Sequence, residues 1–200
     1  MKTIRLTEKL RKEMEKVLDD ERLDHTMGVA YTAASLSFVH GCDLQKALIA
    51  GMLHDCAKNI PDDKKIRLCE KHGIEISTAE QHAPSLLHAK LGAFLAEEQY
   101  GVKDEEVLDA IRYHTTGRPK MTLLEKIIFV ADYIEPNRKV LPHMEELRSQ
   151  AFTDLDGCVL RILQYTLQYL KEKAKVQDPM TRMTYEYYRR RAARQKKSNG

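Results

Sequence analysis

Two places in the sequence put acidic and imidazole side chains next to long apolar stretches. Asp132 lies inside the apolar run 127–134, and a carboxylate buried among such residues needs a paired charge or a bound metal. His54 and Asp55 follow the apolar stretch 47–53 and offer the nitrogen and oxygen ligands that divalent transition metals accept. Each feature also has a plainer interpretation: an aspartate that reaches water or an arginine, and the surface end of a helix.

Residues of the same types recur in a definite order along five predicted helices. A histidine comes first, then the His-Asp pair, then two single histidines and a last aspartate: His25, His54, Asp55, His88, His114 and Asp132. This order resembles the signature of the HD-domain superfamily, and the resemblance covers roughly residues 22–138 of the 200. It implies an all-α fold, an HD-domain helical bundle, with metal-dependent phosphohydrolase activity.

Five short segments narrow the resemblance to the bacterial YqeK family of HD hydrolases. They read R-x-x-H-T at 22–26, H-D-x-A-K at 54–58, L-H-x-x-x-G-A at 87–93, H-T-T-G at 114–117 and A-D-Y-I-E-P-x-R at 131–138. The resemblance implies symmetrical hydrolysis of diadenosine tetraphosphate to two ADP at a di-iron centre. Two alternatives are an HD phosphohydrolase for deoxynucleotides or cyclic dinucleotides, and a sensor that binds a nucleotide without turnover.

The resemblance makes the six residues in this order the expected metal ligands. The first three and Asp132 suffice for one ion, while His88 and His114 supply nitrogens for a second. Asp55 is the natural bridging carboxylate, which would hold the ions about 3.5–4 Å apart and activate a shared water, so we also expect it to be catalytic. The ligand types fit iron first, with manganese, cobalt, nickel or zinc as alternatives, and they require no thiolate.

A polyphosphate substrate also needs fixed positive charge. Lys58 follows His54 by four residues, so a continuing helical turn would place both on one face, and we assign Lys58 to substrate binding and to catalysis through transition-state charge. Arg138 can form a paired hydrogen bond with a phosphate, and Arg22 lies one turn before His25. Spacing alone leaves each cation equally open to a role as a solvated surface residue, and the resemblance favours Lys58 and Arg138.

The residues after His114 are the remaining candidates for substrate binding. Thr115, Thr116 and Gly117 could line a nucleotide pocket through hydroxyl and backbone groups. Gly117 also fits the C-cap of a helix, where a left-handed backbone favours glycine. Both interpretations stay open at this point.

Helical periodicity dominates the chain, and no segment alternates as a strand does. We expect helices at 7–19, 22–40, 44–55, 62–72, 84–100, 105–114, 123–134, 144–152 and 154–173, with a helical tail from 179. Asp43, Asp104 and Thr122 are expected N-caps, and Thr122 with Glu125 fits a capping box. These helices must bring the six ligand candidates together, because none lies within four residues of another except the His54–Asp55 pair.

Length and charge describe an ordinary helical domain. The chain has 33 basic and 30 acidic residues, a formal net charge of +3, which does not point to nucleic acid but suits a small anionic substrate at a positive cleft. We expect one phosphohydrolase domain at 1–175 and a basic C-terminal helix or tail at 176–200. The arginine-rich tail is interpreted as a solvated helix, because no recognition motif accompanies it.

The remaining expectations concern location and partners. No apolar run is long enough to cross a membrane, and the four cysteines have no C-x-x-C spacing and suit a reducing compartment. We therefore expect a cytoplasmic protein whose partner is a dinucleoside polyphosphate or another small nucleotide, with no nucleic-acid or membrane partner. The sequence leaves the oligomeric state open, with a homodimer as one option.

Overall fold

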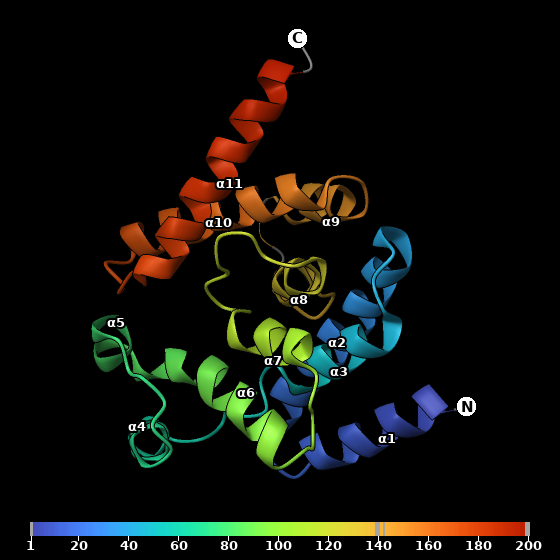
Figure 1. The fold of residues 1–200 in the computed structure, drawn as a ribbon, viewed down its shortest axis with the longest axis vertical. Coiled ribbons are helices and arrows are strands. Elements are labelled where there is room, and N and C mark those ends of the chain that lie inside the picture. Colours follow the sequence, from blue (N-terminus) through green and yellow to red (C-terminus); the bar gives the residue numbers. More distant parts are fainter. Residues whose placement is uncertain (1, 139–140, 142, 199–200) are drawn as a thin grey trace.

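The computed structural model describes residues 2–138, 141 and 143–198, and all regular structure in these residues is helical (Figure 1). The predicted all-α class is therefore confirmed. In chain order the elements are α1 (Lys2–Met14), α2 (Asp20–His40), α3 (Leu44–Leu53), α4 (Asp62–Lys71), α5 (Thr78–His82), the short 3-10 helix η1 (Pro84–Leu87), α6 (His88–Glu98), α7 (Glu105–Arg112), α8 (Leu123–Ile134), α9 (Met144–Thr153), α10 (Leu155–Glu172) and α11 (Pro179–Ser198). Within this part of the chain, no helix combines the length and the apolar character needed to span a bilayer.

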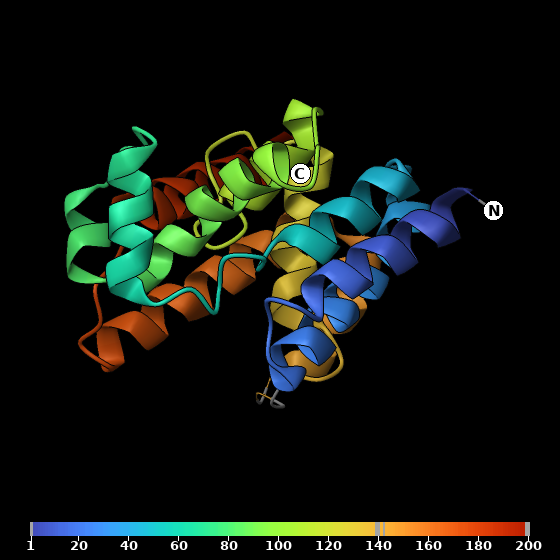
Figure 2. The ribbon, with the colours of Figure 1, turned by 90° about the horizontal axis from the view of Figure 1, so that it is seen from below.

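Helix α8 lies at the centre of the bundle, with α9 and α10 on one side and α2, α3 and α7 on the other (Figures 1 and 2). Its apolar residues Ile127, Ile128 and Val130 are completely buried. Burying each such side chain stabilises the fold by about 1.5–3 kcal/mol. The same helix carries Asp132. This carboxylate therefore belongs to the central helix of the bundle, as its apolar neighbours in the sequence suggested.

Helices α2 and α3 approach one another very closely. A Cβ atom placed on Gly51 would lie 2.7 Å from the Cα atom of Ala30, so only glycine allows the two backbones to meet at this point. Ala30 lies five residues after His25 on α2, and Gly51 lies three residues before His54 at the end of α3. The contact therefore sets the spacing of two of the predicted ligands.

The helix that precedes α2 ends earlier than the sequence suggests. We expected it at 7–19, but α1 ends at Met14 and Asp19 instead begins the next helix. The side chain of Asp19 accepts a hydrogen bond from the backbone nitrogen of Arg22 at 2.8 Å. An aspartate satisfies the free amides at a helix N-terminus better than it continues a helix, so the chain turns before Asp19.

The predicted N-caps of the later helices are largely confirmed. The side chains of Asp43 and Asp104 accept backbone hydrogen bonds at the starts of α3 and α7, and Thr122 accepts one from Glu125 at the start of α8. The predicted capping box is only half present, because the carboxylate of Glu125 forms an ion pair with Arg118. A charged partner holds that carboxylate more strongly than a backbone amide does.

The basic tail forms helix α11, which packs along α10 (Figure 1). Its inner face buries Thr181, Thr184 and Tyr188, and Arg191 on its outer part donates to Asp156 of α10 at 2.9 Å. The end of the helix projects beyond the bundle (Figure 1). The expected division at 175/176 falls in the turn between α10 and α11, and it stays a prediction.

The close approach of α2 and α3 leads to a stability prediction. We expect Gly51→Ala to lower the free energy of unfolding by about 1–3 kcal/mol, because overpacking forces one of two backbones to move. The matched control is Gly92→Ala in α6, where a new Cβ would meet its nearest neighbours at 3.6 Å, an ordinary contact. Urea denaturation followed by circular dichroism measures both, and equal stabilities for the two variants would contradict the role assigned to Gly51.

Candidate metal centre

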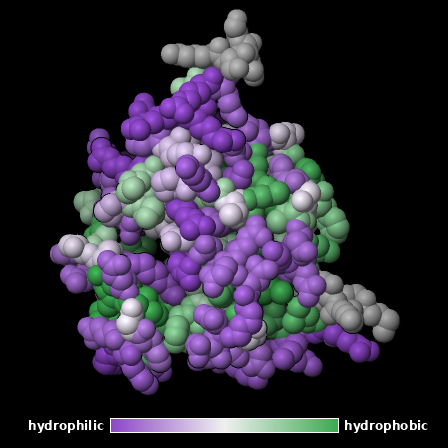
Figure 3. Space-filling model, in the orientation of Figure 1, coloured by the Kyte–Doolittle hydropathy of each residue, from purple (hydrophilic) through white to green (hydrophobic). Residues whose placement is uncertain are grey.

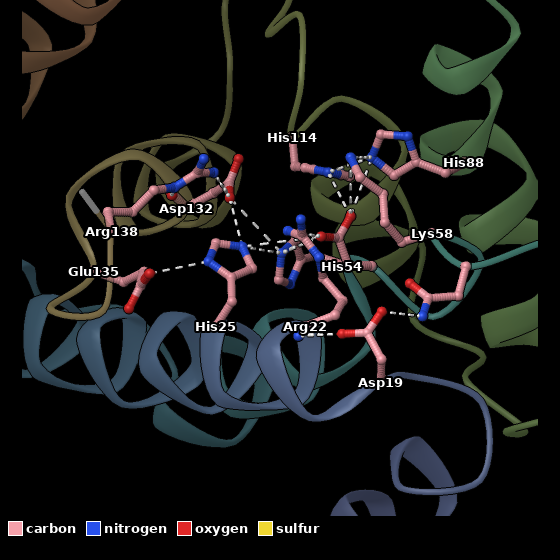
Figure 4. A network of polar contacts seen from close by, with 12 residues as sticks. Asp19, Arg22, His25, His54, Lys58, His88, His114, Asp132, Glu135 and Arg138 are labelled. Atoms are coloured by element: carbon pink, nitrogen blue, oxygen red, sulfur yellow. Dashed lines mark hydrogen bonds and ion pairs between the residues drawn. The ribbon is translucent and has the colours of Figure 1, made fainter.

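The six predicted ligands come together from five helices, at or near helix ends (Figure 4). His25 lies on α2, His54 and Asp55 follow α3, His88 begins α6, His114 follows α7, and Asp132 lies on α8. The four histidines and Asp55 are buried, whereas the side chain of Asp132 remains 19% exposed. The structure therefore assembles residues that are up to 107 positions apart in the sequence.

Three of the histidines are oriented by the helix ends on which they lie. Each uses its Nδ1 atom to donate to the carbonyl oxygen of the residue three positions earlier: His54 to Gly51 at 2.7 Å, His88 to Ser85 at 2.5 Å and His114 to Ile111 at 2.7 Å. A carbonyl oxygen only accepts, so Nδ1 must carry the hydrogen. In the neutral imidazole Nε2 is then a free acceptor, and it points into the centre.

The first half of the centre contains His25 and His54. Their Nε2 atoms lie 3.4 Å apart, and Asp132 Oδ1 lies 3.0 Å from His25 Nε2 and 3.8 Å from His54 Nε2. Asp55 Oδ2 lies 3.5 Å from His54 Nε2. His25, His54 and Asp55 form one group whose ligand atoms all lie within 4.8 Å of one another, and Asp132 adjoins it through His25.

The second half contains His88 and His114 and shares Asp55 with the first. Asp55 Oδ1 lies 3.1 Å from His88 Nε2 and 3.6 Å from His114 Nε2, and the two Nε2 atoms lie 3.1 Å apart. These three atoms form a second group with metal-binding spacing. Asp55 Oδ1 is buried without a hydrogen-bond partner, so acceptors face one another with no hydrogen between them, which favours a cation at this place.

Burial and charge set the protonation states of the centre. Burial lowers the pKa of His54 to about 4 and also lowers the pKa of His88, so both imidazoles are neutral near pH 7. Burial alone would raise the pKa of Asp55, but this pKa lies well below its usual range, and the Arg22 guanidinium at 3.0 Å favours the ionised carboxylate. Burial opposes ionisation of Asp132 as well, yet Arg138 keeps its pKa well below the ordinary value. Neutral imidazoles and ionised carboxylates are the forms that bind metals.

All three predicted substrate-binding cations touch the centre. Arg22 Nη1 lies 3.0 Å from Asp55 Oδ2. Lys58 Nζ lies 3.2 Å from His88 Nε2 and 3.8 Å from Asp55 Oδ1, and burial lowers the pKa of Lys58. Arg138 donates to Asp132 Oδ1 at 2.7 Å. Arg22, which the resemblance favoured less than the other two cations, is thus as close to the predicted ligands as they are.

The predicted residues 115–117 lie beside the centre without a bond to it. Thr116 Oγ1 donates to the carbonyl oxygen of Gly117, and Gly117 has φ +60° and donates its backbone N–H to Tyr113 at 2.8 Å. The C-cap of α7 is Tyr113, so the interpretation of Gly117 as the C-cap is wrong, although its left-handed backbone does favour glycine. Within the described residues, no recorded hydrogen bond or ion pair joins Thr115, Thr116 or Gly117 to the six ligands.

Glu135 is a functional candidate to which the sequence assigned no role. It is 1% exposed, and its Oε1 atom lies 3.0 Å from His25 Nδ1. The Glu135 carboxylate therefore accepts the Nδ1 hydrogen of His25, as backbone carbonyl oxygens do for the other three histidines. Glu135 lies three residues after Asp132 and forms the C-cap of α8, and its contact with His25 arises only from the fold.

The surroundings hold Glu135 in one place. Its Oε2 atom accepts from the backbone nitrogen of Asn137 at 2.6 Å, and Arg148 of α9 donates to its carbonyl oxygen at 3.0 Å. On the opposite side lies Gly28 of α2, where a Cβ atom would overlap Oε2. The carboxylate is thus packed tightly between α2 and the end of α8.

Comparison with known proteins assigns the arrangement to a family. The model of the HD domain matches residues 22–137, a span that contains all six predicted ligands. This chain belongs to the HD-domain family. The resemblance noted in the sequence is confirmed, and hydrolases with this domain are metal-dependent, in agreement with the two groups of ligand atoms.

Two curated relatives of the chain share one name. The protein called symmetrical bis(5'-nucleosyl)-tetraphosphatase of Halalkalibacterium halodurans is 45% identical over 84% of this chain and 89% of its own length. The protein of the same name from Bacillus subtilis is 43% identical over 85% of this chain and 90% of its own length. Both relatives match along the HD domain and beyond it.

A solved structure has the same fold. It is a crystal structure from Clostridium acetobutylicum described as a predicted HD superfamily hydrolase involved in NAD metabolism. It is 38% identical to this chain, covers 92% of it and 97% of its own chain, and superposes with a TM-score of 0.89. The predicted HD-domain bundle is therefore confirmed as the fold.

The position of Glu135 leads to a prediction about metal affinity. We expect Glu135→Gln to weaken metal binding by about 10–100-fold with little loss of stability, since an uncharged amide holds the metal-facing form of His25 less firmly. Titration with Mn²⁺ against a competing chelator measures the affinity, and thermal unfolding monitors the fold. Glu145→Gln, at an exposed glutamate of α9, is the control. Equal metal affinities for the two variants would show that Glu135 has no role in metal binding.

Proposed function

We propose that this protein hydrolyses dinucleoside polyphosphates, and that it splits diadenosine tetraphosphate symmetrically into two ADP. The observation that carries the proposal is the pair of ligand groups that share Asp55. It is supported by the relatives at 45% and 43% identity that bear the name of this activity. Three cations at the edge of the groups supply the charge that a polyphosphate substrate requires.

We infer a centre of two metal ions. His25, His54 and Asp132 would hold one ion, His88 and His114 the other, and Asp55 would bridge them. When bound, such a pair lowers the pKa of a shared water and neutralises phosphoryl oxygens. Imidazole and carboxylate ligands fit iron, our first expectation, and also manganese, cobalt, nickel or zinc.

The nearest thiol supports this choice of ligands. Cys56 is adjacent to Asp55, but its Sγ atom lies 3.5 Å from the carbonyl oxygen of Gly92. The sulfur therefore points away from the ligand atoms. A site made of nitrogen and oxygen alone favours the borderline and hard metals over those that select sulfur.

The cations of the site are suited to binding the phosphates and to stabilising the charge that develops during cleavage. Lys58 stands beside the shared carboxylate, where it can stabilise the negative charge that develops on the leaving phosphate. Arg22 and Arg138 flank the two halves and can bind the phosphates on either side of the cleaved bond. Asp55, buried between them, orients the attacking water by accepting its hydrogen. Thr115, Thr116 and Gly117 lie at the edge of the site, and we propose that they contact the nucleoside there.

Other substrates and partners follow from the same chemistry. Deoxynucleotides and cyclic dinucleotides are the rival substrates, and a nucleotide sensor without turnover is the rival from another class. NAD is a further compound to test, because the solved relative is described as involved in NAD metabolism and NAD also joins two nucleosides through phosphates. We infer a cytoplasmic location, which is supported by four free cysteines among the described residues, and we keep a homodimer as one option.

The shared carboxylate leads to a prediction about metal content. We expect His88→Ala to lower the content from two ions per chain toward one, whereas Asp55→Asn should remove both, because only Asp55 belongs to each group. Elemental analysis of anaerobically purified protein measures the ratio. His82→Ala is the control, since His82 is exposed and bonds only to Thr78. A metal content in His88→Ala equal to that of the unmodified protein would show that His88 is a packing residue and not a ligand.

The products of the reaction test the function itself. We expect ADP alone at early times from diadenosine tetraphosphate, analysed by chromatography in a panel with NAD, deoxynucleotides and cyclic dinucleotides. Lys58→Ala should lower kcat by about 10²–10³-fold and change KM little, because the lost charge acts on the transition state. Lys64→Ala, at an exposed residue of α4, is the control. The products AMP and ATP would reject symmetrical cleavage. If only another compound of the panel is hydrolysed, that compound is the substrate instead of diadenosine tetraphosphate.

A further inference from the structure

A groove with a volume of about 910 Å³ lies between α11 and the loop that carries Pro119. Arginine side chains from α11 dominate its walls, and Tyr187 lies among them. None of the residues of the candidate metal centre lines this groove. It is a separate feature of the molecule, for which the proposed hydrolysis gives no reason.

Three arginines in the groove are left without partners. Within residues 2–138, 141 and 143–198, no recorded hydrogen bond or ion pair engages Arg182, Arg190 or Arg194. They are separated by eight and four residues, so they follow one face of the helix. At a rise of 1.5 Å per residue, the row extends over about 18 Å.

Other charges of α11 are already neutralised. Arg189 donates to Glu186 at 2.8 Å, and Arg191 donates to Asp156 at 2.9 Å. Glu186 is the one acidic residue in the groove and of the helix, and Arg189 holds its carboxylate. Seven basic residues lie on α11, so the rest of the chain carries a net charge of −3. The net positive charge of the chain is thus concentrated on this helix, and the upper part of the molecule in Figure 3 is largely hydrophilic.

The groove is formed by packing and does not require a ligand to shape it. Thr184 is fully buried, and its Cγ2 atom lies 2.9 Å from the position of a Cβ on Gly117. Tyr188 is also buried, and its ring meets the ring of Tyr187 edge to face with centroids 5.2 Å apart. The inner face of α11 is therefore fixed, while half-buried Tyr187 stays open to the groove.

We propose that this groove binds single-stranded nucleic acid. The three free cations are spread too far along the helix for one phosphate group to meet them together, but they match a chain with a phosphate on every unit. A positive groove with an aromatic side chain for base stacking is how proteins bind single strands without sequence preference. The sequence alone suggests a solvated tail, because the groove exists only once α11 packs against the Pro119 loop.

The test uses the full chain and a fluorescein-labelled RNA of about 12 nucleotides, within the usual size of such sites. We expect saturable binding by fluorescence anisotropy. The combined variant Arg182→Gln, Arg190→Gln and Arg194→Gln should bind at least about tenfold more weakly. The slope of log K against log salt should fall by about 2, since each lost contact with a single strand removes about 0.7. Its hydrolysis rate and circular dichroism should match those of the unmodified protein, because the three residues lie outside the metal centre.

A matched variant removes three charges elsewhere. Lys9, Lys12 and Lys71 are exposed on α1 and α4, and their joint replacement by Gln should leave RNA binding within about twofold if the groove is the site. Tyr187→Leu, which keeps apolar packing, should weaken binding by several-fold through lost stacking. Absence of saturable RNA binding, equal losses in the two triple variants, or equally effective competition by inorganic tripolyphosphate would overturn the proposal.

Discussion

Four imidazole nitrogens and the carboxylate of Asp55 meet in the interior with their acceptor atoms toward one another. The Nδ1 hydrogens of His54, His88 and His114 are already donated to backbone carbonyls, so no hydrogen remains to separate the acceptors. Burying such a set is unfavourable in the absence of positive charge. The structure supplies part of that charge with Lys58 and Arg22 at the edge. A bound metal pair would supply the rest, and most of the surrounding architecture serves to hold these acceptors in place.

Helix ends are well suited to this task. The last carbonyls of a helix have no partner within it, and His54 and His114 use them to fix their rings. His25 lies within α2 and finds no free carbonyl, so it needs Glu135, which the end of α8 brings to it. Glycines then allow the helices to come close enough, at Gly51 between α2 and α3 and at Gly28 beside Glu135. The site is therefore a property of how helices meet, more than of any one helix.

The sequence predicts the role of a residue only where the neighbouring residues in the sequence reveal whether it is buried. Asp132 was predictable because its apolar neighbours require a buried helix, and the order of the ligands predicted the fold. Glu135 was not, since a glutamate before a proline at a helix end is usually solvated, and its partner is 110 residues away. The sequence did not predict the packing of α11 against the bundle, for a different reason. Its inner face buries Thr181 and Thr184, so the apolar periodicity that reveals a packed helix is weak there.

The protein uses positive charge in two distinct ways. At the candidate metal centre, Arg22 and Arg138 are paired with Asp55 and Asp132. On α11, by contrast, three arginines have no acidic partner in the described structure and attract polyanions directly. The two regions meet through the residues that lead from His114 to Gly117, which rests against Thr184 of α11. Only two residues separate Gly117 from His114, so the predicted metal centre and the packed face of α11 lie at the two ends of one short segment.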